Sequence, residues 1–330
     1  MSLSTTYLLS GSVCALGILS VIGAASLAHS DQLETPAWAY PLNIGGPPKP
    51  APDDGSLKHV PNSSVALTQT AIRNIFSAVD WHPEAHPTMP ESVAHGRAKD
   101  LFACGYCHYP NGQGRPENSS LAGLPAAYIV EQVAAMKDGS RKSSQPAMIA
   151  PALMLRVAAH ANPDEVAEAA AYFASLKYRA WIRVVETDTA PRTEIHGVSA
   201  YAPAADGSRE AIGDRIVEVA EDDARTDVRD DASGFVAYAP VGSIERGKTL
   251  ASTAVGERRP CAECHGETLR GSETAPSLAG RSPSYLYRQL FDIQAGTRSG
   301  PGVGKMKLEV AALTPAEMRD LVAFAASLAP

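Results

Sequence analysis

The pattern C-x-x-C-H occurs twice in the chain, as Cys104-Gly105-Tyr106-Cys107-His108 and as Cys261-Ala262-Glu263-Cys264-His265. In this pattern the two thiols can add across the vinyl groups of a haem, and the following histidine can point its imidazole at the iron. A disulfide or half a zinc site would use the same cysteines. A zinc site needs four ligands, and Cys14 is the one cysteine outside the two motifs. We therefore interpret each motif as the attachment site of one covalently bound haem c.

The sequence around the two motifs repeats as well. Ser120-Leu121-Ala122-Gly123 follows the first motif at the spacing at which Ser277-Leu278-Ala279-Gly280 follows the second. Tyr128, Gln132, Gly139 and Arg141 correspond in the same way to Tyr285, Gln289, Gly296 and Arg298. Apolar spacing predicts helices at Ala126–Lys137, Asp164–Leu176, Ser284–Gln294 and Pro315–Leu328. The repeat therefore predicts two mainly α-helical domains, at residues 91–178 and 243–330.

The ligand on the other face of each iron decides between electron transfer and catalysis, because an open position admits substrate. Thr314-Pro315-Ala316-Glu317 reads as a helix N-terminus with a capping box, which places Met318 inside a helix and makes it a core residue. Met306 lies eight residues before this cap, next to a glycine-rich segment that we expect to be a loop.

The first copy offers Met136, Met148 and Met154. Met136 falls in a predicted helix and is assigned to packing. Asn162 begins a second capping pattern, and Met154 lies eight residues before it, as Met306 does before Thr314. This register favours Met154 over Met148, so both irons are predicted to have His/Met ligands.

The start of the chain is apolar. Leu8–Ala28 has no charged residue and is long enough to span a bilayer. Residues 1–30 are therefore interpreted as an uncleaved membrane anchor, with a signal peptide cleaved near Ala28 as the alternative. Residues 31–90 follow as a proline-rich tether with one short helix, predicted at Val65–Val79. His82, His86 and Met89 lie in a proline-broken loop, which we assign to packing in preference to a metal site.

The segment 179–242 separates the two predicted domains. Alternating residues at Trp181–Val185 and Ile216–Val219 predict strands, so we expect a small β-rich insertion. The acidic run Glu221–Asp231 is expected to be a solvated face, with a docking surface as the alternative. The net charge of −7 argues against nucleic-acid binding.

These features together resemble the di-haem class I cytochromes c, in particular the c4 type. The resemblance rests on C-x-x-C-H, S-L-A-G, Y-x-x-x-Q, G-x-R, the ligand methionine and the closing Y-F-A-S-L, and it covers Glu91–Leu176 and Ser243–Leu328. It implies His108 and His265 as proximal ligands, Met154 and Met306 as distal ligands, and Arg141 and Arg298 as propionate partners, with ordinary surface charge as the alternative for the arginines. It also implies that the carbonyl of Pro276 orients His265. Ser119 stands at the matching position of the first copy.

The fold class we expect is mainly α: two tandem class I cytochrome c domains, a β-rich insertion and an N-terminal apolar helix. The expected function is electron transfer in the periplasm by a protein anchored to the inner membrane, with a dehydrogenase or oxidase as redox partner and no catalysis of its own. A di-haem peroxidase and the haem subunit of a terminal oxidase are the alternatives. A peroxidase needs a haem that opens a coordination position, which two methionine ligands disfavour.

Overall fold

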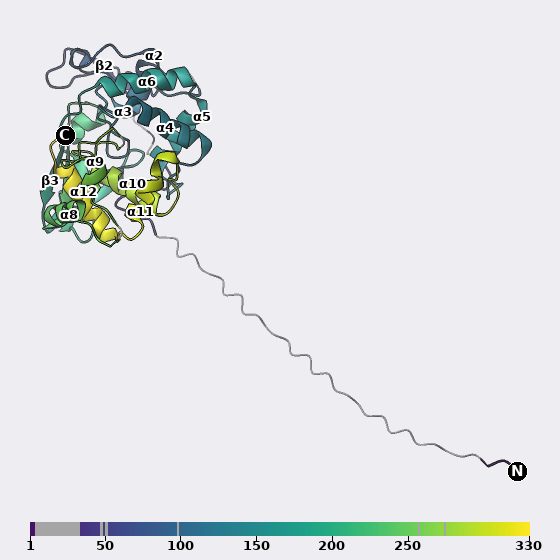
Figure 1. Cartoon of the computed structure of the whole chain (residues 1–330). Coiled ribbons are helices and arrows are strands. Elements are labelled where there is room, and N and C mark those ends of the chain that lie inside the picture. Colours follow the sequence, from purple (N-terminus) through teal and green to yellow (C-terminus); the bar gives the residue numbers. More distant parts are fainter. Residues whose placement is uncertain (4–33, 47–48, 50–51, 98, 257, 274) are drawn as a thin grey trace. The chain divides into compact units, whose positions relative to one another are not determined.

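The computed structural model describes residues 1–3, 34–46, 49, 52–97, 99–256, 258–273 and 275–330. The chain divides into two units, Met1–Leu33 and Glu34–Pro330. The apolar segment Leu8–Ala28, for which we predict a helix, lies outside the described residues. Within the described residues, no helix has the length and apolar character needed to cross a membrane. Both C-x-x-C-H motifs belong to the second unit (Figure 1).

The second unit combines helices with short strands. Its α-helices are α1 (Gln69–Ile72), α2 (Glu91–Ala94), α3 (Cys104–His108), α4 (Ala126–Asp138), α5 (Ile149–His160), α6 (Pro163–Ser175), α7 (Asp223–Asp227), α8 (Ser243–Ser252), α9 (Cys261–His265), α10 (Pro283–Gln294), α11 (Gly304–Val310) and α12 (Pro315–Ser327). Its strands are β1 (Leu57–Lys58), β2 (Leu67–Thr68), β3 (Ile182–Glu186), β4 (Thr189–Pro191), β5 (Thr193–His196), β6 (Ala200–Pro203), β7 (Arg209–Ala211), β8 (Val217–Ala220) and β9 (Phe235–Ala239). Two 3₁₀ turns, η1 (Pro83–Ala85) and η2 (Pro301–Val303), complete the set.

The internal repeat predicted from the sequence is present in the element order. The helices α3, α4, α5 and α6 correspond to α9, α10, α11 and α12. The four predicted helices are confirmed to within a residue at each end. Both predicted capping boxes are present, Asn162 with Glu165 at the start of α6 and Thr314 with Glu317 at the start of α12. Each box satisfies backbone N–H groups that the first helical turn leaves without partners.

The two copies differ at their N-terminal ends. In the second copy α8 has ten residues, whereas α2 in the first copy has four. The prediction of one helix over Val65–Val79 is wrong, because only Gln69–Ile72 is helical there and the chain then turns at Asn74–Phe76. The Asn74 side chain accepts from the backbone N–H of Phe76, a local hydrogen bond that competes with helix continuation.

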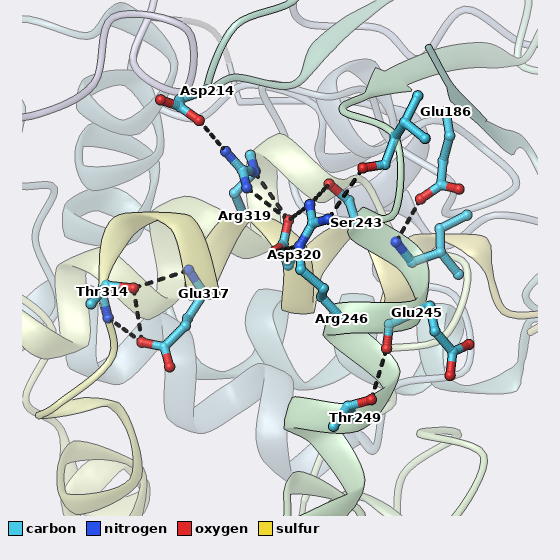
Figure 2. A network of polar contacts seen from close by, with 12 residues as sticks. Glu186, Asp214, Ser243, Glu245, Arg246, Thr249, Thr314, Glu317, Arg319 and Asp320 are labelled. Carbon is cyan, nitrogen blue, oxygen red and sulfur yellow. Dashed lines mark hydrogen bonds and ion pairs between the residues drawn. The ribbon is translucent and has the colours of Figure 1, made fainter. Parts of the chain in front are cut away.

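The helices α8 and α12 cross in close contact in the second copy. A Cβ at Gly247 would lie 2.0 Å from the backbone oxygen of Asp320, so the crossing requires glycine. Figure 2 shows Asp320 between two arginines: Arg246 Nε lies 2.6 Å from its Oδ2, and Arg319 Nη2 lies 3.0 Å from its Oδ1. Arg319 also reaches Asp214 of the insertion at 2.8 Å. Close packing at Gly247 and the ion pair between Arg246 and Asp320 therefore both hold α8 against α12.

The segment 179–242 contains the two strands predicted from the sequence, as β3 and β8. Its main sheet has the order β3-β9-β8, with β3 parallel to β9 and β8 antiparallel to it. The first and last strands of the insertion thus lie side by side, and the chain between β3 and β8 forms two further strand pairs, β4–β7 and β5–β6. Ile182 and Val184 of β3 pack against the core of the second copy. The acidic run differs from its prediction: it contains α7, and Asp230 and Asp231 within it are buried.

Part of the predicted tether is packed against the second copy. Ala39 and Tyr40 are fully buried, and the Trp38 ring lies 4.5 Å from the Tyr287 ring. The Tyr40 hydroxyl donates to Asp292 Oδ1 at 2.7 Å, and Arg288 donates to the Ala39 carbonyl at 2.8 Å. These contacts hold the residues just after Leu33 on α10, so free movement is excluded for this part of the segment.

We expect Gly247→Ala to destabilise the protein by at least about 1–3 kcal/mol, because the added methyl must push α8 away from α12. At an unconstrained helix position the same change stabilises by up to about 1 kcal/mol. The matched control is Gly304→Ala at the start of α11, where an added Cβ would meet no atom within 4 Å. Urea unfolding measures both variants, and equal stabilities would contradict the close crossing.

We expect Tyr40→Phe to lower the free energy of unfolding by about 1–3 kcal/mol, because it leaves the buried Asp292 carboxylate short of a donor. Tyr201→Phe is the control, since the Tyr201 hydroxyl makes an exposed hydrogen bond to Ala37 of the same segment. Chemical denaturation compares the two variants. A larger loss for Tyr201→Phe would show that the segment is not held through Asp292.

Candidate haem sites

The two motif histidines are oriented in the same way. The Nδ1 of His108 lies 2.8 Å from the Ser119 carbonyl oxygen, and the Nδ1 of His265 lies 2.8 Å from the Pro276 carbonyl oxygen. A proton donated from Nδ1 to a carbonyl leaves the Nε2 lone pair free for a metal. Burial lowers the pKa of both imidazoles, which favours the neutral form that ligation needs. The expected hydrogen bond at Pro276 is present, and the Ser119 carbonyl makes the same bond.

The loop after each histidine carries the accepting carbonyl. Gly114 N–H donates to the His108 carbonyl, and Gly271 N–H donates to the His265 carbonyl. Both glycines have positive φ, +68° and +90°, where a side chain is strained. A Cβ at Gly114 would lie 2.7 Å from the Ser119 oxygen itself, and one at Gly271 would lie 2.8 Å from Ser277 N. Glycine therefore lets each loop fold back over its histidine.

A cavity of about 710 Å³ adjoins the first motif. It is lined by Cys104, Cys107, His108 and Met154, together with apolar side chains from α4, α5 and α6. The core of the first copy is correspondingly small, since its helices surround this space. A large, mostly apolar cavity next to two thiols and a neutral imidazole fits a haem bound through Cys104 and Cys107.

The structure separates the methionine candidates of the first copy. Met154 lies in α5 and lines the cavity together with His108. Met148 is fully buried in the core of the second copy. This arrangement favours Met154, as the capping register does. Met136 was assigned to packing, and the structure adds that its side chain lines the same cavity from α4.

The second site has the same donor set. Cys261 and Met306 both pack against the core of the second copy, and His265 is buried. Met306 lies in α11, which corrects the expectation of a loop there. Met318 is fully buried inside α12, as predicted. The two thiols and the carbonyl-bound imidazole match the first site group for group and fit a second haem.

The motif cysteines are free thiols, so the disulfide alternative is not formed. Burial raises the pKa of the Cys104 thiol to about 12 and also raises the pKa of Cys107 and Cys261. Among the described residues, neither motif lies in a group of three or more side chains placed to bind one metal ion, whereas a zinc site needs four ligands.

Arg141 and Arg298 join the two copies. Arg141 donates to Gln132 of its own copy at 2.9 Å and to Tyr285 and Gln289 of the other copy, each at 2.9 Å.

Arg298 makes the reciprocal set, to Gln289 at 3.1 Å, Tyr128 at 3.0 Å and Gln132 at 2.9 Å. The backbones of the two arginines also form an antiparallel bridge. The repeated Tyr, Gln and Arg positions therefore meet across a pseudo-two-fold axis, here called the arginine interface.

The arginines are less than 10% exposed, which excludes ordinary surface charge. Arg141 lines the first cavity, so a guanidinium faces the space where a haem would sit. The Nε of Arg298 is buried without a hydrogen-bond partner, which leaves one donor for a further acceptor. Propionate binding by both residues stays a prediction that these positions support.

Three cavity residues were not found from the sequence. Arg115, Arg229 and Arg288 all line the first cavity, and Arg115 and Arg288 are buried. Arg288 comes from α10 of the second copy, and its counterpart in the repeat is Glu131, so the repeat gives no signal for it. Arg229 comes from the insertion and lies over the Tyr106 ring at 4.0 Å. The first site is thus completed by the second copy and the insertion.

Comparison with known proteins agrees with this geometry. Residues 244–329 match the family model described as cytochrome c. The thiosulfate dehydrogenase electron acceptor of Thiomonas intermedia (strain K12) is 24% identical over 231 residues, which cover 69% of this chain and 79% of that protein.

Solved structures with detectable likeness include two of the cytochrome c4 type. Cytochrome c4 of Acidithiobacillus ferrooxidans is 21% identical with a TM-score of 0.44, and the match covers 68% of this chain and 98% of that protein. Cytochrome c4 of Pseudomonas stutzeri is 19% identical with a TM-score of 0.41, and the match covers 68% of this chain and 93% of that protein. Thiosulfate dehydrogenase of Marichromatium purpuratum is 24% identical with a TM-score of 0.46. The match covers 70% of this chain and 37% of the dehydrogenase chain. The family match lies in the second copy and includes the motif Cys261–His265.

We expect Arg141→Met and Arg298→Met each to destabilise the protein by about 2–4 kcal/mol, because each removes three hydrogen bonds made by a buried guanidinium. The cost of the double variant should differ from the sum by about 0.5–3 kcal/mol, because the two arginines share Gln132 and Gln289 as acceptors. Denaturant unfolding of all four proteins gives the coupling. The exposed Arg192→Met is the control, with a loss of at most about 1 kcal/mol. Strict additivity would contradict a shared interface.

Proposed function

We propose that this chain is a periplasmic di-haem cytochrome c that carries electrons between redox proteins and is held at the inner membrane by its N-terminal segment. The cytochrome c match of residues 244–329 supports the electron-transfer function, and the number of haems, the location and the partners are our own proposal. The observation that carries it is the matched anchoring of His108 and His265, each fixed through Nδ1 by a backbone carbonyl at 2.8 Å.

Each group of residues has a distinct role in this account. Haem iron, when bound, gains and loses one electron at a time. His108 and His265 would offer Nε2 to the iron from rings whose orientation is fixed through Nδ1, and Met154 and Met306 would supply thioethers that raise the potential. The apolar lining of the first cavity excludes water. The arginine interface keeps the two sites in one arrangement, so electrons pass between fixed positions.

The electron donor we propose is a thiosulfate-oxidising dehydrogenase. The similarity to the thiosulfate dehydrogenase electron acceptor supports this, since it extends over most of both chains. The net charge of −7 suits a donor with a basic docking surface. The apolar segment Leu8–Ala28 supports export, and cell fractionation that finds the haem protein in the cytoplasm would contradict that part.

The peroxidase and oxidase alternatives differ in what they require. A peroxidase needs one haem with a coordination position that opens, whereas we propose a methionine ligand at each site, Met154 in the wall of the first cavity and Met306 in α11. An oxidase subunit would co-purify with a copper-containing partner. A high-spin haem in the resting protein would favour the peroxidase over the electron carrier, and tight co-purification with such an oxidase would favour the oxidase subunit.

We expect Met154→Leu and Met306→Leu each to convert one of two haems from low spin to high spin, because leucine keeps the volume and removes the sulfur ligand. Met148→Leu and Met318→Leu are the matched controls and should keep both haems low spin, since their side chains are buried in the protein core. Absorption spectra of the oxidised proteins report the spin state of each haem in the four variants. Conversion by Met148→Leu, with Met154→Leu unchanged, would reverse the assignment.

We expect a thiosulfate dehydrogenase with its substrate to reduce both haems of this protein, and the second-order rate to fall steeply from low to high salt. Screening weakens attraction between opposite charges beyond about 10 Å at 0.1 M salt. Stopped-flow absorbance measures the rate. No reduction would remove the proposed donor, and a salt-independent rate would remove the electrostatic part of the docking.

A further inference from the structure

A buried cluster outside the haem sites connects the insertion to the N-terminal part of the first copy. The loop at residues 80–86 meets the turn at residues 222–233 there. Trp81 is fully buried, and its Nε1 donates to the Val228 carbonyl at 2.8 Å. His82 follows it, and His82 Nε2 lies 3.2 Å from Asp230 Oδ1. The cluster is therefore built from two segments that are far apart in the sequence.

Three side chains of this cluster bring atoms that can bind a metal close to one another. One ligand atom each from His82, Asp230 and Asp231 lies within 4.8 Å of the other two. Two ligands of one zinc-type ion, each about 2.1 Å from it, are about 3.0–3.4 Å apart at tetrahedral or octahedral angles. The separation of 3.2 Å between His82 and Asp230 falls in that range. No side chain has to move far for the pair to share an ion.

The ion pair between His82 and Asp230 does not explain the burial of Asp231. The residue is 7% exposed, and its Oδ1 is buried without a hydrogen-bond partner. Asp230, in contrast, is satisfied: Arg225 Nε lies 2.7 Å from its Oδ2, and the Ala232 N–H donates to its Oδ1 at 3.0 Å. A buried carboxylate oxygen with no donor costs free energy unless a cation compensates it.

Both histidines of the loop at residues 80–86 face Asp231, and so do further carboxylates. Asp80 is a further carboxylate near the cluster, and it is engaged by His86 at 3.2 Å. Glu84 adds another carboxylate 3.8 Å from His82 Nδ1. The guanidinium of Arg225 is directed at Asp230. The cluster therefore has more carboxylates than cationic side chains.

We propose that His82, Asp230 and Asp231 bind a divalent first-row transition ion of the zinc type. One imidazole and two carboxylates form a nitrogen and oxygen donor set suited to such an ion. The Glu84 carboxylate near His82 Nδ1 is placed as an outer partner that would fix the ring. This proposal goes beyond the sequence interpretation of His82 as a packing residue. His86 and Met89 are outside the site.

The ion would fasten the insertion over the first haem cavity. Asp227 and Arg229, which line that cavity, belong to the same turn as Asp230 and Asp231. Arg229 also donates to the backbone carbonyl of Tyr106, inside the first C-x-x-C-H motif. Metal binding would therefore stabilise the cover of the first site while leaving the second site untouched.

Zinc binding to the untagged protein with both haems attached tests the proposal. After dialysis against EDTA, calorimetric titration with Zn²⁺ should show one ion per chain, and Zn²⁺ should raise the thermal unfolding midpoint by several degrees. His82→Gln and Asp231→Asn should each weaken the affinity at least about ten-fold. The matched control is His196→Gln, because His196 and Asp227 form an exposed pair at 2.8 Å and lie outside the cluster.

Asp231→Asn separates ligation from folding. It removes an uncompensated buried charge, so the metal-free variant should unfold at a higher temperature than metal-free wild type and show no further rise with Zn²⁺. Unchanged haem spectra verify that each variant is folded. The proposal is overturned if wild type binds no zinc, if both variants bind as wild type does, or if His196→Gln loses the binding. None of these outcomes bears on the electron-transfer function.

Discussion

The structure depends on two buried arginines that exchange partners across the two copies. Arg141 and Arg298 each carry a full charge into a site less than 10% exposed, and each is stabilised by glutamine and tyrosine acceptors drawn from both copies. A buried guanidinium that loses its acceptors costs several kcal/mol. The two copies are therefore not free to rotate about a linker, and the first haem cavity, with Arg141 and α10 residues in its wall, is fixed by the same contacts.

This constraint explains why the two sites are not equivalent despite the repeat. The second copy has a long N-terminal helix, α8, packed on α12, and the family model matches here. The first copy has only α2 at that position, and α10 and the insertion supply the wall that is missing. Because Arg288 and Arg229 line the first cavity and the repeat supplies no arginine that corresponds to either, two haems bound at these motifs would have different surroundings and different potentials, with the hydrogen bond to each histidine kept the same.

Sequence reasoning succeeded where the signal was local or repeated. The capping boxes at Asn162 and Thr314 predicted two helix starts, and the motif spacing predicted the histidine anchors. It failed where tertiary contacts decided the structure. Pro36–Tyr40 looked like free tether because nothing in its composition reveals that Tyr40 finds Asp292. Asp230 and Asp231 looked like a solvated acidic face, since burial among His82 and Arg225 depends on residues far away in the sequence. Arg288 could not be found by comparing the copies, which have Glu131 in its place.

The central claim is that both motifs carry haem with a histidine and a methionine on the iron. An anaerobic optical redox titration of the protein matured in an exporting host, with spin state followed throughout, tests it most directly. The account predicts two one-electron steps at positive potentials, unequal in midpoint, with both haems low spin at every stage. A titration with a single one-electron step, which would mean one haem per chain, would contradict the account. So would a haem that is high spin or has a strongly negative midpoint potential.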